Sequence, residues 1–582
     1  MVPSTFTVVD LGDAGSGSGL TGDLRYAVNT ANSNADLSNE IVFQPGLTGT
    51  ITLRQGKLVI TKALEIDGPG ADLLTVSGNH QSGVLDIEAT VGQTVTLSDL
   101  TIADGTGSGA SQGRSVGGGL FNEAASVILN RVSVSGNTVL SQGIGGGIFN
   151  DVQGSMVLND SSVSENHVRS DSFDGAIDNK GAMTLNRTTV AGNSAPGLGG
   201  TLVGQNIENG GTLTIDHSLI TENTGEIANG SQLVVNASSI TYNTGFAGAG
   251  ISNSIGRATI TDSTIANNST QYVGGGLYNQ VGEMIVTGST ITGNTALYGG
   301  GIDIASGHLQ MMNSTISGNT AQNEGGGLWA GYYHSGLLDL TSVTITLNTS
   351  LSHVSGYGGG GGVYLASIQA FHIRNSIVAG NTAAIEPRDF DGDVQSLGHN
   401  LIGQADDSTG WVATDLTGTS TDPLDPRLGP LQDNGGPTMT HALLAGSPAL
   451  EAGDPLLAGS TDQRGSVRVS SQPLDIGAFQ TEPATQFVIL APSQVNAGEP
   501  FTITVIALDQ WGNVASTYAG TVQFSSTDKS AQWPDNYTFL PDDAGSHTFT
   551  VTLQAPGPQD LTVGEPDPYS NVRGSVTVQV TE

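Results

Sequence analysis

Short runs of alternating apolar and polar residues recur along most of the chain, separated by turns that contain glycine or asparagine. Met284-Ile-Val-Thr and Ser289-Thr-Ile-Thr are examples in which every second side chain is apolar. Alternation with a period of two over a few β-branched residues predicts a β-strand with one buried face. The runs are too short for helices, so the pattern predicts an all-β protein.

Two phrases repeat in a fixed order. One is a glycine run followed by an apolar pair, as in GGGLFN at 117–122 and GGGLYN at 274–279; the other is β-rich and ends in Asn, as in TITGN at 290–294. The first glycine and the Asn lie 19 to 23 residues apart, whereas the Asn and the next glycine phrase lie 5 to 12 apart. A segment of nearly constant length joined to a variable one predicts a parallel β-helix with loops on one edge.

The repeated Asn and Gly residues are expected at the corners of the coils. Asn tolerates the left-handed backbone that a sharp corner needs, and its amide can hydrogen-bond to the Asn of the next coil. Glycine allows a positive φ and a close approach between coils. The coils are therefore predicted to cover residues 49–382.

The two ends of the solenoid are expected to be covered, because unpaired strand edges are prone to aggregate. Within residues 1–48, the segment 20–33 has helical spacing of apolar residues after Thr21, a suitable N-cap, and predicts a helix over one end. Glycine runs vanish in 383–482, which predicts an irregular C-terminal cap. Residues 486–582 contain strands of four to eight residues separated by turns, as expected for an Ig-like β-sandwich.

Several phrases resemble known families. Gly22-Asp-Leu-Arg-Tyr-Ala-Val and the GGGLYN and TISGNTA phrases resemble secreted bacterial right-handed β-helix proteins with polymorphic outer-membrane, adhesin-like repeats. The cap resembles the choice-of-anchor Q region, and the last residues are similar to bacterial Ig-like repeats of surface proteins. The resemblance implies secretion and display at the cell surface, and no defined reaction. The motifs of the cap are LGHNLIG at 397–403, DNGGP at 433–437, SPALEAG at 447–453, DQRG at 462–465 and DIGAF at 475–479.

Composition narrows the range of partners. The 582 residues include 17 Lys and Arg against 53 Asp and Glu, a net charge of −36, and no basic cluster, which argues against nucleic acid and against a cleft for anionic polymers. No Cys is present, so disulfides and thiolate metal sites are excluded. No apolar run approaches 18 residues, so no membrane insertion by this segment is expected. The start at Met1-Val-Pro lacks a signal peptide, and we expect a fragment of a larger protein.

Catalysis is left open, with the balance against an enzyme. Glycoside hydrolysis needs two carboxylates across the scissile bond. Asp178 and Asp303 follow glycine phrases at comparable positions but lie several coils apart, and Asp216-His217 matches pectate lyases in a single tripeptide. No catalytic residue is therefore assigned, although a polysaccharide lyase or glycoside hydrolase on this scaffold remains the alternative.

Two sets of residues are candidates for binding. Asp389, Asp391 and Asp393 alternate around Gly392, partly like a calcium loop, although an acidic solvated turn fits as well. Aromatic residues in two long-loop coils are candidates for stacking on sugar rings, or else fill the interior. These aromatic residues are Trp329, Tyr332, Tyr333 and Tyr357.

The sequence thus predicts an extracellular, cell-surface adhesin or structural stalk. Its partners would be a polysaccharide or an envelope component, and its only candidate cofactor is Ca²⁺. Loops on one edge of a rigid rod, repeated along its axis, would give multivalent contact of low individual affinity.

Overall fold

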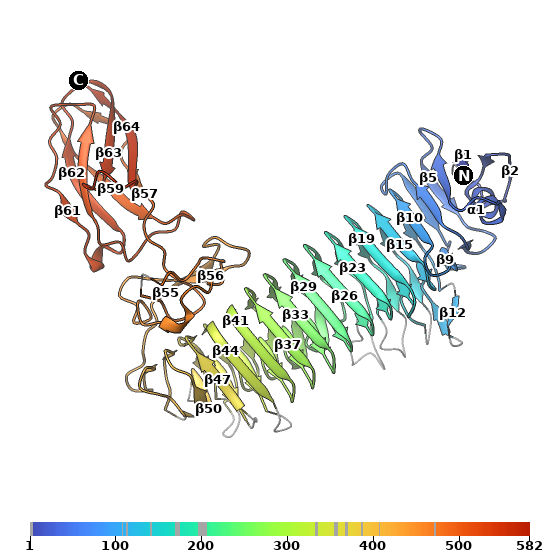
Figure 1. The fold of residues 1–582 in the computed structure, drawn as a ribbon, viewed down its shortest axis with the longest axis horizontal. Helices are drawn as coiled ribbons and strands as arrows, with labels where there is room; N and C mark the ends of the chain where they lie inside the picture. Colours follow the sequence, from blue (N-terminus) through green and yellow to red (C-terminus); the bar gives the residue numbers. More distant parts are fainter. Residues whose placement is uncertain are drawn as a thin grey trace.

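The computed structural model is an elongated parallel β-helix with a second β-unit at its C-terminal end (Figure 1). It describes residues 4–582 except 108, 112–113, 140–142, 169–174, 196–205, 332–335, 354–358, 367–369, 386–387, 407 and 471–472. The coils stack in parallel and in register, so the predicted all-β solenoid is confirmed.

One face of the solenoid is a 14-stranded parallel sheet, here called the short-strand sheet. In most of its strands the outer two residues point into the core, as Leu277 and Asn279 do, and the middle one points outward. Its strands are β6 (Leu58–Ile60), β9 (Leu85–Ile87), β14 (Leu120–Asn122), β18 (Ile148–Asn150), β22 (Ile177–Asn179), β25 (Ile207–Asn209), β28 (Ile227–Asn229), β32 (Ile251–Asn253), β36 (Leu277–Asn279), β40 (Ile302–Ile304), β43 (Leu328–Ala330), β46 (Val363–Leu365), β50 (Phe390–Asp393) and β53 (Ser408–Thr409).

Two further faces complete each coil, and they merge where the long strands β41 (His308–Ser317) and β44 (Leu337–Thr346) span both. The longer strands before β41 are β4 (Asn39–Phe43), β7 (Leu64–Asp67), β10 (Thr94–Ser98), β15 (Ser126–Asn130), β19 (Ser155–Asn159), β23 (Ala182–Asn186), β26 (Thr212–Asp216), β29 (Gln232–Asn236), β33 (Arg257–Thr261) and β37 (Glu283–Thr287). The shorter ones are β5 (Gly49–Thr52), β8 (Leu74–Ser77), β11 (Thr101–Ala103), β16 (Ser133–Ser135), β20 (Ser162–Ser164), β24 (Thr189–Ala191), β27 (Leu219–Thr221), β30 (Ser239–Thr241), β34 (Thr264–Ala266) and β38 (Thr290–Thr292).

Asparagine side chains form two hydrogen-bonded ladders inside the solenoid. Along the first, which runs from Asn137 to Asn381, each side-chain amide donates to the amide oxygen of the next coil over 2.9 to 3.0 Å. The second runs from Asn122 to Asn279 with distances of 2.8 to 3.0 Å. The predicted hydrogen bonding along the axis is confirmed, whereas the left-handed backbone falls on the residue before each Asn of the first ladder, such as Tyr242 with φ of 56°.

The glycine phrases have the predicted role. Gly274 has φ of 63°, and a Cβ at Gly275 would lie 2.3 Å from the carbonyl oxygen of Gly300 in the next coil. A larger residue there would push neighbouring coils apart, since real Cβ atoms do not approach a carbonyl so closely.

The N-terminal end is covered by β1 (Ser4–Val8) and α1 (Leu24–Ser33). The helix begins at Leu24, four residues later than predicted, because the carboxylate of Asp23, not Thr21, caps it by accepting the N–H of Tyr26 at 2.8 Å. At the other end the strands continue past residue 382, through β52 (Leu401–Ile402) to β54 (Leu416–Thr417).

The segment after β54 turns back and lies along the side of the rod. Its strands β55 (Leu428–Gln432) and β56 (Thr440–Leu443) form a hairpin, and its side chains hydrogen-bond to coils between Gly288 and Asn375. Among these contacts, the Thr315 hydroxyl donates to Gln463 Oε1 at 2.6 Å and Arg374 pairs with Asp454 at 2.7 Å.

The C-terminal β-unit contains two sheets around a core of its own. In Figure 1 it stands at an angle to the rod, joined to it by the segment that carries β55 and β56. One sheet has the order β57 (Gln486–Leu490), β59 (Pro500–Leu508), β62 (Ser546–Thr552). The other has the order β58 (Gln494–Asn496), β64 (Arg573–Thr581), β63 (Gly557–Gly564), β60 (Thr521–Ser526), β61 (Tyr537–Thr538).

Candidate functional site

The middle residues of the short-strand sheet form a single row along the outside of the rod, here called the outer column. Since the strands pair in register, each member lies beside the equivalent residue of the next coil, about 4.8 Å away. Acidic and aromatic residues dominate this row. Its members from β6 to β50 are Val59, Asp86, Phe121, Phe149, Asp178, Glu208, Ala228, Ser252, Tyr278, Asp303, Trp329, Tyr364 and Asp391.

Asp178 and Glu208 are neighbours in the outer column and share one lysine. Lys180 Nζ lies 3.1 Å from Asp178 Oδ1 and 2.7 Å from Glu208 Oε1. Asp178 is fully buried, and burial together with repulsion from Glu208 outweighs Lys180 and raises the pKa of Asp178 to about 7. The triad was not predicted from the sequence, because Glu208 lies on the coil after the one that carries Asp178 and Lys180.

Asp303 occupies the outer column between Tyr278 and Trp329. It is 1% exposed, and neither of its carboxyl oxygens has a hydrogen-bond partner among the described residues. Burial raises the pKa of Asp303 well above its usual range. Asp178 and Asp303 are thus in equivalent positions, as their spacing from the glycine phrases indicates, but are not brought together.

Trp329, a predicted sugar contact, is packed in this structure. Its ring is 6% exposed, lies 5.6 Å from the ring of Tyr298, and its indole N–H donates to Glu324 Oε2 at 3.3 Å. It is nevertheless outside the solenoid core, on the outer column. The other three predicted contacts, Tyr332, Tyr333 and Tyr357, lie outside the described residues, so sugar contact by this group stays a prediction.

Aromatic residues on three successive coils form a second feature, near the edge of the short-strand sheet. Phe246 and Tyr272 lie with ring centroids 4.5 Å apart, and the backbone N–H of Tyr298 donates to the carbonyl of Tyr272. The signal in the sequence is an aromatic residue three or four positions after the ladder residues Asn243, Asn268 and Asn294. Phe246 and Tyr272 are 38% and 41% exposed, which distinguishes them from Trp329.

The three candidate calcium ligands do not converge. Asp389 is 3% exposed and ends the first asparagine ladder, where its Oδ1 accepts the backbone N–H and the side-chain amide of Asn381 at 2.8 and 3.0 Å. Asp393 is exposed and accepts from the hydroxyl of Thr409 at 2.6 Å. Among the described residues no group of three acidic or histidine side chains is arranged to hold a metal ion, so Ca²⁺ binding stays a prediction.

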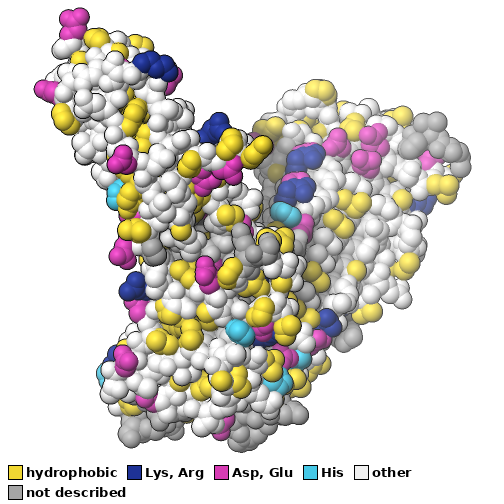
Figure 2. Space-filling model, turned by 60° about the vertical axis from the view of Figure 1, so that its left-hand side comes forward, with side chains coloured by type: hydrophobic (Ala, Val, Ile, Leu, Met, Phe, Trp, Pro, Cys, Tyr) yellow, Lys and Arg dark blue, Asp and Glu magenta, His cyan; other side chains and the backbone are white. Residues whose placement is uncertain are grey.

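Asp216 and His217 belong to a row of exposed charges at one corner of the rod. Asp216 accepts a hydrogen bond from the Asn236 amide at 2.6 Å and pairs with His217 at 3.0 Å. Both contacts lower the pKa of Asp216, and the hydrogen bond from Asn236 has the larger effect. The ion pair of Arg187 with Asp160 is a similar exposed feature. This geometry gives no catalytic arrangement. On the face in Figure 2, basic, acidic and histidine side chains lie next to one another in places, among a majority of uncharged side chains.

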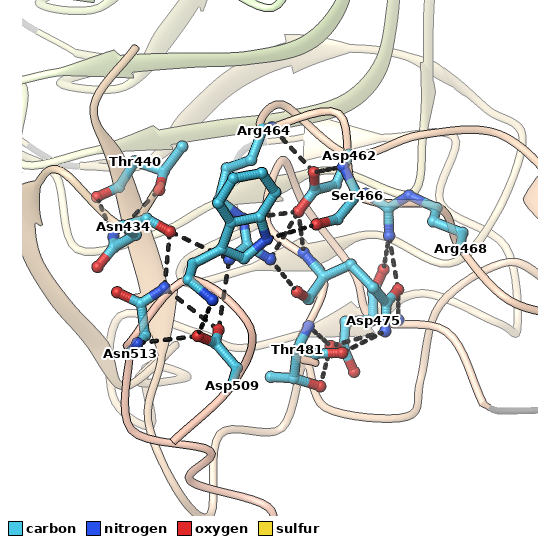
Figure 3. Close-up of polar contacts among 12 residues, drawn as sticks. Asn434, Thr440, Asp462, Arg464, Ser466, Arg468, Asp475, Thr481, Asp509 and Asn513 are labelled. Atoms are coloured by element: carbon cyan, nitrogen blue, oxygen red, sulfur yellow. Dashed lines mark hydrogen bonds and ion pairs between the residues drawn. The ribbon is translucent and has the colours of Figure 1, made fainter. Parts of the chain in front are cut away.

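A buried polar network joins the rod to the C-terminal unit (Figure 3). At its centre is Arg464, which is fully buried, donates to Asp462 at 3.0 Å, and lies 3.8 Å from the ring of Phe479. From the C-terminal unit, Asp509 approaches Arg464 to within 3.7 Å, and its Oδ1 accepts the N–H of Trp511 at 2.8 Å.

Three further hydrogen bonds cross this joint. Trp511 Nε1 donates to Ser466 Oγ at 3.1 Å, the Asn513 side chain to the Asn434 carbonyl at 2.6 Å, and the Ser516 hydroxyl to the Leu443 carbonyl at 3.1 Å. The turn after β59 therefore docks against the DNGGP and DQRG phrases, through Asn434 of the first and Arg464 of the second. The ion pair with a buried arginine, together with the hydrogen bonds from Trp511, Asn513 and Ser516, favours one orientation of the two units.

One comparison with known proteins gives a likeness. The A-module of mannuronan C-5 epimerase AlgE6 of Azotobacter vinelandii is similar in fold, with a TM-score of 0.41 and 12% identity over 68% of this chain and 94% of that chain. A TM-score and a sequence identity this low do not support an inference about function. No family model and no curated protein matches the sequence. No helix in the described part of the chain is long and apolar enough to span a membrane.

Proposed function

We propose that this protein is an extracellular, surface-displayed adhesin or structural stalk. In this proposal the solenoid is a right-handed β-helix of the adhesin-like type, and the C-terminal unit is an Ig-like domain. The observation that carries the proposal is the joint around Arg464, because it makes the rod and the second unit one continuous body. A rod with a fixed extension suits a protein that presents surfaces away from a cell.

The partners we propose are a polysaccharide or another component of the cell envelope. The chain carries a net charge of −36, so a neutral partner is favoured over an anionic one. Ca²⁺ at Asp389, Asp391 and Asp393 remains a proposal of its own.

Labelling of intact cells tests the display at the surface. Antibodies against the purified protein should label intact cells of the source organism, and external protease should remove the label. Labelling that appears only after the cells are made permeable would contradict the proposal.

A carbohydrate-active enzyme is the second candidate, and the outer column favours it. A carboxyl with a pKa of about 7 beside a second carboxyl, as in Asp178 and Glu208, is the kind of pair that glycoside hydrolysis uses. The two residues lie on neighbouring strands, about 4.8 Å apart, and both carboxyl groups contact Lys180. New reducing ends from polysaccharide incubated with the protein, and their loss in Asp178→Asn, would support the enzyme and contradict the proposal of a stalk.

A further inference from the structure

A small cavity opens beside the exposed aromatic residues Phe246 and Tyr272. Its volume is about 160 Å³, and the rings of Phe246 and Tyr272 form one side of it, tilted by 43° to one another. Both rings remain well exposed although they touch, so neither serves to fill a core. The remaining lining is rich in hydroxyl and amide groups: Thr244 and Gly245 from β31 (Thr244–Ala247), with Ser269, Thr270 and Gln271 from β35 (Ser269–Val273).

The backbone builds this cavity through an irregular pairing. Thr244 pairs with Ser269 and Gly245 with Thr270, but Ala247 pairs with Val273, so β35 has an extra residue opposite Phe246. The Thr270 hydroxyl holds the irregularity in place: it donates to the Phe246 carbonyl at 2.7 Å and accepts the N–H of Tyr272 at 3.1 Å. Such bulges redirect side chains and are often found next to functional sites.

Charge around the cavity favours an uncharged ligand. Glu226 lies directly behind the floor, since its Oε2 accepts the N–H of Phe246 at 3.1 Å and a Cβ at Gly245 would come within 2.8 Å of it. Burial raises the pKa of Glu226 to about 8, so this carboxyl is neutral at pH 7. Among the residues that the structure describes, the lining includes no Lys or Arg that could hold a carboxylate, sulfate or phosphate group.

We propose that this cavity binds one sugar ring of a neutral polysaccharide. The aromatic faces would stack on the C–H face of the ring, and Thr244, Ser269 and Gln271 would exchange hydrogen bonds with its hydroxyl groups. Tyr298 on the next coil continues the row, so the bound polymer would run along the axis of the rod. This inference rests on the proposed function and gives it a site and a ligand class.

The test is retention on immobilised polysaccharides. Neutral polymers (cellulose, β-1,3-glucan, mannan and chitin) are compared with alginate and pectate. We expect the wild type to be retained by at least one neutral polymer, and Phe246→Ala/Tyr272→Ala to bind it at least about tenfold more weakly, the equivalent of about 1.4 kcal/mol. Tyr242→Ala is the matched control, because Tyr242 is 60% exposed on the same coil but does not line the cavity. Far-UV circular dichroism and melting confirm that each variant is folded.

The outcomes separate this site from the function on which it rests. Equal retention of the wild type and the double variant would overturn the site and leave the proposed function standing. Retention by alginate or pectate alone would overturn the neutral ligand. A wild type that binds none of the polymers would overturn both the site and the polysaccharide partner.

Discussion

Glu226 gives the sharpest prediction about stability. Its carboxyl is 6% exposed and has a pKa of about 8 in the folded protein, against an ordinary value of 4.5. Below pH 4.5 both the folded and the unfolded chain hold the proton, so burial of this group carries no electrostatic cost. Between pH 4.5 and about 8 only the unfolded chain ionises, and the free energy of unfolding falls as the pH rises.

The magnitude follows from the gap between the two pKa values. A gap of about 3.5 pH units, at about 1.4 kcal/mol per unit, corresponds to a loss of up to about 5 kcal/mol by pH 8 and above. Glu226→Gln keeps the neutral shape and an oxygen that can accept the N–H of Phe246, so it should avoid this loss. The variant should therefore match the wild type near pH 4.5 and be increasingly more stable up to about pH 8.

Denaturant unfolding followed by circular dichroism at several pH values measures this difference. Glu222→Gln, an exposed residue on the same coil, is the matched control and should not change the pH dependence. A stability difference between Glu226→Gln and the wild type that does not grow with pH would refute the argument.

Three further predictions address the ladder, the joint and the metal. Asn243→Ala removes an amide that bonds to Asn268 and to a backbone carbonyl, each at 3.0 Å, and should cost about 1–3 kcal/mol per buried group left unpaired, measured as a lower unfolding midpoint; an unchanged midpoint would contradict the role of the ladder. Trp511→Ala should broaden the distance distribution in small-angle scattering without changing the melting of the solenoid, and an unchanged distribution would show that the joint does not need the indole. Asp391→Asn with Asp393→Asn should lower the melting temperature in calcium but not in chelator, whereas equal losses would refute the calcium site.

Periodicity made the fold predictable. The Asn and Gly phrases mark the corners that successive coils share, so one coil is enough to recognise the unit and its repetition along the chain indicates a solenoid. The N-terminus of the helix was less predictable, because Thr21 and Asp23 are both good caps and local sequence does not decide between them.

The candidate sites were harder to predict because they depend on contacts between coils. Asp178 and Asp303 are the middle residues of their strands and point away from the core, yet Asp178 is fully buried and Asp303 is 1% exposed. The cavity at Phe246 and Tyr272 arises from one extra residue in the pairing of two strands, and no pattern within either strand indicates it. Trp329 was predicted to contact sugar or to fill the interior, and its packing against Tyr298 of the preceding coil could not be inferred from its own loop.

Incubation of the wild-type protein with the neutral and anionic polysaccharides in calcium tests the central claim most directly. Depletion of protein from solution and the appearance of reducing or unsaturated ends are measured in the same samples. Our account predicts depletion by a neutral polymer with no new ends. New ends would contradict the account and identify an enzyme, and a protein that stays in solution with every polymer would contradict the polysaccharide partner.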